Sequence, residues 1–313
     1  MRGGWRRRAL LLTALMLVTS TATACGGGAS QTVRVVRIAT GEEQGVYYEY
    51  GQALAGLIRA EMPDVEVTVL TTAASMENLQ LVTDRQADIG FTQADVAAEW
   101  ASRASLVALA RLYDDDVHVV VPAQAPVRTL ADLRGRRIST GATGSGTEVT
   151  ANRLLTVAGL NPFTDVLPLH LDLNESVTAL RQGAIEAFFF SGGLPVTAIT
   201  TLARDIPIRL LNLGSYVAQM RRQFGEQYSE RVVPRSTYGT IPVATVGIAN
   251  YLVVRPDMPE ELAYTLTRLL FDGRETLAGA HPAGARLNMR SAINTHPLDL
   301  HPGAVRFYRE RKT

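Results

Sequence analysis

The chain has 313 residues, with 31 basic and 30 acidic side chains, a formal net charge of +1 and 46% hydrophobic residues. This length predicts two domains of ordinary size, and the apolar content suffices for a large core. The near balance of charges argues against a nucleic-acid-binding surface. The single cysteine excludes a disulfide within the chain.

The first 24 residues have the pattern of a secretory signal peptide. Four arginines within the first eight residues precede an apolar run at residues 9–18, which is too short to cross a bilayer. Small residues then lead to Cys25, an arrangement that resembles a bacterial lipoprotein signal. We therefore expect an extracytoplasmic protein anchored to the cell membrane by a lipid on Cys25, or a secreted protein if Cys25 is not modified.

The next segment predicts a short tether and a first α/β series. Residues 25–32 are small or polar and indicate a flexible tether. Ser75 is expected to cap the second helix of the series, with Glu77 in its first turn. The alternation of strands and helices predicts a mainly parallel sheet covered on both faces. The expected strands are residues 33–39, 65–69, 87–91 and 117–121. The expected helices are one that contains Tyr50 to Ile58 and ends before Pro63, one at residues 75–84 and one at residues 95–104.

A second α/β series follows. Pro195 suits the first turn of a helix after the expected strand at residues 187–190, and Gly159 suits a helix end. The two series predict two lobes, the first containing residues 33–121 and 249–313 and the second residues 122–248. The expected elements are helices at residues 129–133, 145–158 and 176–182, strands at residues 137–139, 187–190 and 246–254, and a helix from Pro259.

The loop at residues 141–148 has the clearest local pattern of a ligand-binding loop in the sequence. It joins a strand to a helix, and its three glycines allow a ligand to approach the backbone. The helix start at Gly144, Ser145, Gly146 and Thr147 would present N–H groups to a small anion. No lysine precedes Thr147, so the loop is not a P-loop. The alternative is a plain glycine turn with a helix cap.

Further strand-to-helix loops offer candidate ligand contacts. Tyr47 could supply a hydroxyl and an aromatic wall, although packing in the core is an equal alternative. Ser75 and Asn78 could face the same cleft or act only as helix caps. Gln93 could present its amide, and the turn at Gly192 and Gly193 further backbone N–H groups.

Other features argue against catalysis and against a metal or cofactor. The five histidines are dispersed without metal-ligand spacing. Asp114, Asp115 and Asp116 predict a solvated acidic turn. No nucleophile elbow, triad or carboxylate pair stands out, so we expect a protein that is not an enzyme and binds no cofactor.

A set of motifs in order resembles the TAXI family of extracytoplasmic solute receptors for TRAP transporters. They span nearly all of the chain that follows the signal peptide. The motifs are Ile38-Ala39-Thr40-Gly41, Gly45-Val46-Tyr47-Tyr48, Ser75-Met76-Glu77-Asn78-Leu79, Ala87-Asp88-Ile89-Gly90-Phe91-Thr92-Gln93-Ala94-Asp95-Val96, Leu130-Ala131-Asp132-Leu133-Arg134-Gly135, Gly144-Ser145-Gly146-Thr147, Ala187-Phe188-Phe189-Phe190-Ser191-Gly192-Gly193-Leu194-Pro195, Tyr251-Leu252-Val253-Val254-Arg255, His301-Pro302-Gly303-Ala304 and Phe307-Tyr308-Arg309-Glu310.

The resemblance implies the type 2 periplasmic-binding-protein fold, in which two α/β lobes with mainly parallel sheets are joined by crossing hinge strands. It also implies capture of a small organic acid or an acidic amino acid such as glutamate by lobe closure, and delivery to a TRAP membrane subunit. Tyr47, Ser75, Asn78, Gln93, Ser145, Thr147 and the turn at Gly192 fall on family pocket motifs.

This chain departs from the family at two loops. Glu42-Glu43-Gln44 and Ala73-Ala74 stand where the family usually has more glycine. Three alternatives remain: a binding protein for an ATP-driven importer or a sensor, a surface interaction protein with a vestigial cleft, and an enzyme on the same two-lobed fold.

Overall fold

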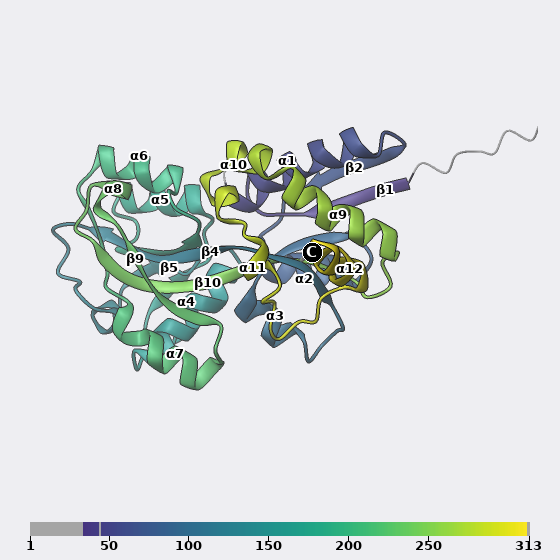
Figure 1. The fold of residues 1–313 in the computed structure, drawn as a ribbon. Coiled ribbons are helices and arrows are strands. Elements are labelled where there is room, and N and C mark those ends of the chain that lie inside the picture. Colours follow the sequence, from purple (N-terminus) through teal and green to yellow (C-terminus); the bar gives the residue numbers. More distant parts are fainter. Residues whose placement is uncertain (1–33, 44, 312–313) are drawn as a thin grey trace, which may run out of the picture. The chain divides into compact units, whose positions relative to one another are not determined.

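The computed structural model describes residues 34–43 and 45–311, so the predicted signal peptide, Cys25 and the tether lie outside the described residues. The described part alternates strands with helices (Figure 1). Its first elements are β1 (Arg34–Ala39), α1 (Val46–Glu61), β2 (Val65–Leu70), α2 (Ser75–Thr83), β3 (Ile89–Gln93), α3 (Ala94–Trp100), β4 (Val107–Pro122), the 3-10 turn η1 (Leu130–Leu133), β5 (Arg137–Ser139) and α4 (Gly146–Val157).

The second part continues the alternation and ends in helices. Its elements are β6 (Leu167–Leu169), α5 (Leu173–Arg181), β7 (Ala187–Gly192), α6 (Thr197–Asp205), β8 (Ile208–Leu210), η2 (Gly214–Tyr216), α7 (Val217–Phe224), β9 (Tyr228–Val233), α8 (Arg235–Tyr238), β10 (Val243–Val254), α9 (Glu260–Asp272), α10 (Arg274–Ala280), η3 (Pro282–Arg286), α11 (Met289–Ala292) and α12 (Pro302–Glu310). Among the described helices, none combines the length and apolarity that a membrane crossing requires.

The described strands form one sheet in the order β2-β1-β3-β10-β4-β7-β5-β6, with β8 paired to β4 and β9 to β10. At one flank β1 is parallel to β2 and β3, and at the other β5 is parallel to β6 and β7. Between the flanks, β4 and β10 are antiparallel to each other and to their neighbours. The predicted fold class is confirmed: two parallel α/β lobes are joined by two long crossing strands.

The two crossing strands connect the lobes because each pairs with both. The first half of β4 pairs with β10 from Val107 to Asp116, and its second half pairs with β7 in the second lobe. Strand β10 pairs with β9 through its first half and with β3 through its second. Figure 1 shows β4 and β10 side by side between α5 and α6 at one end and α1 and α9 at the other.

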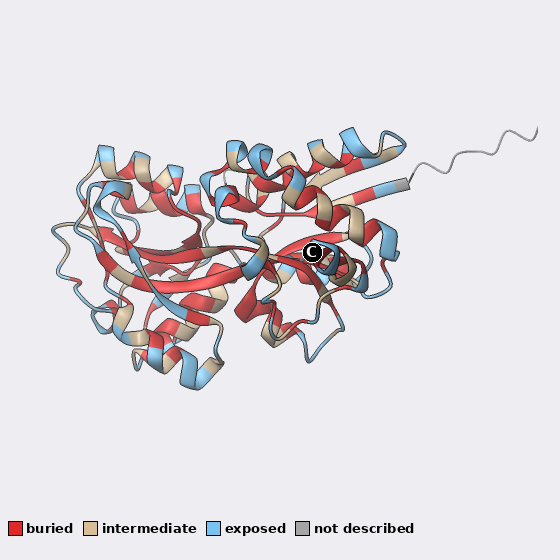
Figure 2. Cartoon of the chain, in the orientation of Figure 1, coloured by how far each residue is buried: buried red, intermediate tan, exposed pale blue. Residues whose placement is uncertain are grey.

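Apolar residues at helical spacing bury α1 against the first lobe, as predicted. Tyr50, Leu54 and Ile58 recur every four residues and are fully buried, in one cluster with Phe307. Burying a side chain of this kind stabilises the fold by about 1.5–3 kcal/mol. Figure 2 shows the buried residues along the sheet and on the helix faces turned toward it.

One local prediction is wrong, and one predicted strand is longer than expected. Pro195 does not lie in the first turn of a helix, because α6 begins at Thr197 with Val196 as its N-cap. The N–H of Val196 donates to the Tyr238 hydroxyl at 3.0 Å, which holds Val196 in an extended conformation. The strand expected at residues 117–121 is instead the second half of β4, which starts at Val107.

Candidate ligand-binding site

A small cavity lies where the two lobes meet, beside the starts of α1, α2 and α4. Its volume is about 60 Å³. One water molecule requires about 10–15 Å³ of volume measured in this way, so the cavity suits a small polar ligand. Its lining residues are Gly41, Glu42, Gly45, Val46, Tyr47, Ala73, Ala74, Ser75, Gln93, Tyr113, Asp115, Ser145, Gly146, Thr147, Phe190, Ser191 and Gly192.

Seven of the ten predicted site residues line this cavity: Tyr47, Ser75, Gln93, Ser145, Gly146, Thr147 and Gly192. The structure does not bring Asn78, Gly144 and Gly193 to its wall. Asn78 is fully buried, where its amide donates to the carbonyls of Thr40 and Phe91 at 2.5 and 2.9 Å. It ties β1 to β3 and has no free donor for a ligand.

The two glycines outside the cavity wall have structural contacts. The carbonyl of Gly144 accepts the N–H groups of Met76 and Glu77, so it joins the α4 loop to the start of α2. A Cβ on Gly193 would lie 3.1 Å from Ala283, so this glycine permits close packing in its turn.

Ser75 is not the N-cap of α2, contrary to the prediction. The cap position is Ala74, whose φ of 87° lies in the region that favours glycine. Ser75 is therefore the first helical residue, and its Oγ accepts the backbone N–H of Gln93 at 3.1 Å. This bond fixes the end of β3 against α2.

The start of α4 is held by its own loop, and the predicted capping-box spacing is met only in part. Ser145 is the N-cap, and its Oγ accepts the Glu148 N–H at 3.0 Å. The Glu148 carboxylate accepts the N–H of Gly144 at 2.8 Å. The N–H groups of Gly146 and Thr147 belong to the first turn, which has no intrahelical acceptors, and both residues line the cavity.

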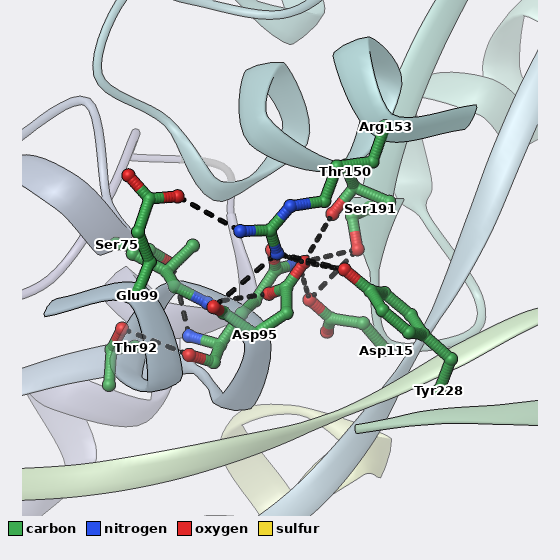
Figure 3. A network of polar contacts seen from close by, with 11 residues as sticks. Ser75, Thr92, Asp95, Glu99, Asp115, Thr150, Arg153, Ser191 and Tyr228 are labelled. Atoms are coloured by element: carbon green, nitrogen blue, oxygen red, sulfur yellow. Dashed lines mark hydrogen bonds and ion pairs between the residues drawn. The ribbon is translucent and has the colours of Figure 1, made fainter. Parts of the chain in front are cut away.

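Three side chains form a polar cluster in the cavity wall. The Gln93 amide donates to Asp115 Oδ2 at 2.8 Å and to Ser191 Oγ at 2.5 Å, and the Ser191 hydroxyl donates to Asp115 Oδ2 at 3.3 Å. The N–H of Ser191 donates to Thr147 Oγ1 at 3.1 Å. Figure 3 shows Asp115 and Ser191 turned toward each other. The cluster thus connects β3, β4, β7 and α4.

The prediction of a solvated turn at Asp114–Asp116 is wrong. All three residues lie on β4, and Asp115 and Asp116 are buried. Asp116 accepts from Arg231, and Asp114 is paired with Arg111 and Arg231. Asp115 was missed because its partners come from other strands. One feature of the sequence could have indicated its burial: apolar residues flank the three aspartates on both sides, as in one continuous strand.

Burial raises the pKa of Asp115 from 3.8 to about 7, and neighbouring Asp116 adds to the rise. Hydrogen bonds from Gln93 and Ser191 and the nearby Asn250 amide oppose it. The Asn250 nitrogen does not reach hydrogen-bond geometry, so neither Asp115 Oδ1 nor Asn250 Nδ2 has a hydrogen-bond partner among the described residues. The site thus holds a carboxyl group that gains or loses its proton near neutral pH.

Asp115 should make the protein less stable as the pH rises. Its pKa is about 7 in the folded protein and near 3.8 when unfolded, so the unfolded chain loses the proton first. The free energy of unfolding therefore falls between about pH 4 and about pH 7. Asp115→Asn cannot titrate, so its melting temperature relative to wild type should be higher at about pH 8 than at about pH 5.

Thermal unfolding of both proteins at the two pH values measures this difference. The Glu42 carboxyl titrates in both proteins, so the comparison isolates Asp115. An equal difference in melting temperature at both pH values would show that Asp115 keeps an ordinary pKa in the folded protein.

Tyr47 and Tyr113 supply aromatic walls. The Tyr47 ring stacks on Phe91 with centroids 5.1 Å apart, and its hydroxyl donates to Asn250 Oδ1. The Tyr47 hydroxyl therefore donates its hydrogen bond to β10 and not to a ligand. Burial raises the pKa of Tyr47 well above its usual value. Tyr113 was not predicted as a site residue, and its buried hydroxyl has no hydrogen-bond partner within residues 34–43 and 45–311.

Glu42 bridges the lobes at the cavity. Its carboxylate accepts the Leu173 N–H at the start of α5 at 3.2 Å. Burial raises the pKa of Glu42 to about 7; the bond to Leu173 opposes this rise, and Asp172 and Glu175 add to it. The loop between β1 and α1 therefore contacts the second lobe.

A second polar network joins α3 of the first lobe to α4 and β9 of the second (Figure 3). Asp95 Oδ2 accepts from Arg153 at 3.1 Å, from Thr150 at 3.1 Å and from Tyr228 at 3.0 Å. Arg153 also pairs with Glu99 at 2.9 Å. The Asp95 side chain is fully buried and that of Arg153 is 13% exposed, so the ion pair between Asp95 and Arg153 is shielded from water.

Residues 38–311 match the model of the NMT1-like family, which is most of the chain. The chain belongs to the NMT1-like family. Members of this family are periplasmic solute-binding proteins, so the NMT1-like protein has the fold and the extracytoplasmic location of that class.

Solved structures agree on the fold of this NMT1-like protein. The periplasmic aliphatic sulphonate binding protein SsuA of Escherichia coli is 18% identical, with a TM-score of 0.51 over 88% of this chain and 83% of that one. A Listeria monocytogenes protein named for an L-cystine ABC transporter is 14% identical, with a TM-score of 0.54 over 82% and 98%. The GluR0 ligand-binding core, in complex with L-glutamate, is 12% identical, with a TM-score of 0.52 over 82% and 99%.

Proposed function

We propose that this NMT1-like protein captures a small organic acid or acidic amino acid by closing its two lobes, without catalysing a reaction. The observation that carries the proposal is one cavity lined from both lobes, with the start of α4 on one side and Gln93 on the other. Helix N-termini favour anions because their first N–H groups have no intrahelical acceptor. A ligand that contacts both sides favours the closed state.

The proposed lobes keep the predicted boundaries, residues 33–121 with 249–313 and residues 122–248. Closure would bend the two crossing strands near Val121 and Ala249. An irregular register of β10 on β4 between Ala249 and Tyr251 supports bending at that point.

Delivery of the ligand to a TRAP-type membrane subunit is the proposed next step, and it rests on the ordered motifs described above. An ATP-driven importer is the second candidate partner, because solved structures of the same fold carry the names of ABC transporter proteins. Uptake of the captured ligand by cells that lack one transporter gene or the other would separate the two.

Thermal unfolding with a panel of dicarboxylates and amino acids tests the receptor proposal. A ligand that binds only the folded protein raises the melting temperature with the logarithm of its concentration. Small-angle scattering should then show a smaller radius of gyration at saturation. Stabilisation by sugars or cations alone would overturn the proposed ligand class, and a panel without effect would favour a surface interaction protein.

Anchoring by a lipid on Cys25 is also proposed, from the basic start, short apolar run and small residues before it. Cys25→Ser should shift the protein from the membrane fraction to the soluble fraction. Stable anchoring requires more than one acyl chain. Wild-type protein that is fully soluble after export, or that begins at another residue by mass spectrometry, would contradict the anchor.

A further inference from the structure

The three consecutive aspartates of β4 differ in their charge partners. Asp114 and Asp116 are each paired with Arg231, and Asp114 also with Arg111. Successive side chains of a strand point to opposite faces, so Asp115 points away from these arginines and into the cavity wall. In the described part of the chain, no ion pair joins Asp115 to a basic side chain.

The unpaired oxygen Asp115 Oδ1 lies near one other unpaired acceptor, Gln93 Oε1, and near two neutral donors without partners among the residues described, the Tyr113 hydroxyl and Asn250 Nδ2, but none of these groups supplies a positive charge. Asp115 is 3% exposed and Gln93 is 2% exposed. In the part of the chain that the structure describes, neither Asp115 Oδ1 nor Gln93 Oε1 has a hydrogen-bond partner. The amide orientation of Gln93 is fixed, because its nitrogen donates to both Asp115 and Ser191. Leaving a buried acceptor without a donor costs about 1–3 kcal/mol, and more for a charged group.

We propose that Asp115 recognises an ammonium group, so that the ligand of this site is a small amino acid rather than a simple organic acid. This inference rests on the proposed receptor function and narrows its ligand class. An ammonium supplies three N–H donors and the positive charge that Asp115 lacks. The carboxylate of the same ligand would lie at the first turn of α4, beside Gly146 and Thr147.

The position of the two groups supports a zwitterion. Asp115 and the start of α4 line one cavity of about 60 Å³, so a short ligand reaches both. Ser191 connects them, since its hydroxyl donates to Asp115 and its N–H to Thr147. A negative group at α4 and a positive group at Asp115 would each meet a complementary charge or dipole.

Matched ligand pairs test the inference by isothermal titration calorimetry. Glutamate and glutarate differ only in the amino group, as do aspartate and succinate. We expect the amino acid of at least one pair to bind roughly ten- to a hundredfold more tightly than its dicarboxylate partner, as for a charge-assisted hydrogen bond. Asp115→Asn should reduce this ratio to near one, while the protein keeps a cooperative thermal transition.

Asp114→Asn is the matched control, because it makes the same chemical change one residue away on the opposite face of β4. It should keep the preference for the amino acid. Loss of the preference in both variants would overturn the assignment to Asp115.

The other outcomes separate the inference from the proposed function. Dicarboxylates that bind as tightly as the amino acids would overturn the ammonium site but keep the receptor for small acids. Binding of ethanolamine or putrescine in place of all acids would support Asp115 and overturn the acidic ligand. A panel with no binding would overturn both.

Discussion

Replacing Gly146 by alanine is expected to weaken ligand capture roughly 5- to 150-fold, the range that follows from an overpacking cost of about 1–3 kcal/mol. A Cβ at this position would lie 2.2 Å from Gln93 Oε1 and 2.7 Å from Ser75 Oγ. Gln93 cannot simply turn away, because its amide is bonded to Asp115 and Ser191. The lobes would relieve the clash by remaining apart.

Calorimetry with the tightest acid of the panel measures this effect, and scattering should show incomplete closure at the same ligand concentration. Gly56→Ala is the matched control. Gly56 lies within α1, and a Cβ there meets nothing within 4 Å. It should leave affinity unchanged and raise stability slightly. Unchanged affinity in Gly146→Ala would mean that Gln93 and the start of α4 do not approach each other around the ligand.

The elements that could be predicted from the sequence are those with strong local signals. Helix α1 shows regular spacing of Tyr50, Leu54 and Ile58, and the β5 strand at residues 137–139 has the predicted bounds. The N-cap at Ser145 also follows from local chemistry, because a serine just before a helix readily accepts the N–H of the residue three positions later.

The polar side chains of the cavity could not be predicted in the same way. Asp115 has the composition of a surface turn, and it is buried because β7 and β10 flank β4 from distant parts of the sequence. Asn78 has the composition of a pocket residue, yet its three bonds to Thr40, Thr72 and Phe91 make it structural. Only the strand pairing distinguishes these two cases.

The backbone conformation of Ala74, the N-cap of α2, also could not be predicted from the sequence. Two alanines before α2 suggest a loop without special conformation, but Ala74 adopts a positive φ. Two local bonds hold this conformation: the Ala74 N–H donates to Thr72 Oγ1 at 3.0 Å, and its carbonyl accepts the Asn78 N–H at 2.8 Å. The Asn78 side chain in turn donates to the distant carbonyl of Thr40, which fixes this turn against the end of β1. Such a position has a strain of roughly 1–3 kcal/mol that the surrounding contacts must offset.

Arg153→Met should lower the free energy of unfolding by about 3–5 kcal/mol, because it leaves the Asp95 carboxylate buried without a positive partner. The Asp95 side chain is 0% exposed and that of Arg153 is 13% exposed. The hydroxyls of Thr150 and Tyr228 and the backbone N–H of Val96 would still donate to the carboxylate, but none of them carries a positive charge. Methionine retains much of the length and apolar surface of the arginine stem, so the change tests the charge.

Urea denaturation of wild type, Arg153→Met, Asp95→Asn and the double variant gives the coupling between the two residues. The double variant should recover much of the loss, since it has no buried unpaired charge. Arg134→Met removes an exposed ion pair with Asp165, whose side chains are 57% and 29% exposed, and should change stability by about 1 kcal/mol or less. If Arg153→Met lowered the free energy of unfolding no more than Arg134→Met does, water would reach Asp95 in solution. Since Asp95 lies on α3 of the first lobe and Arg153 on α4 of the second, that result would mean that the free protein opens between its lobes.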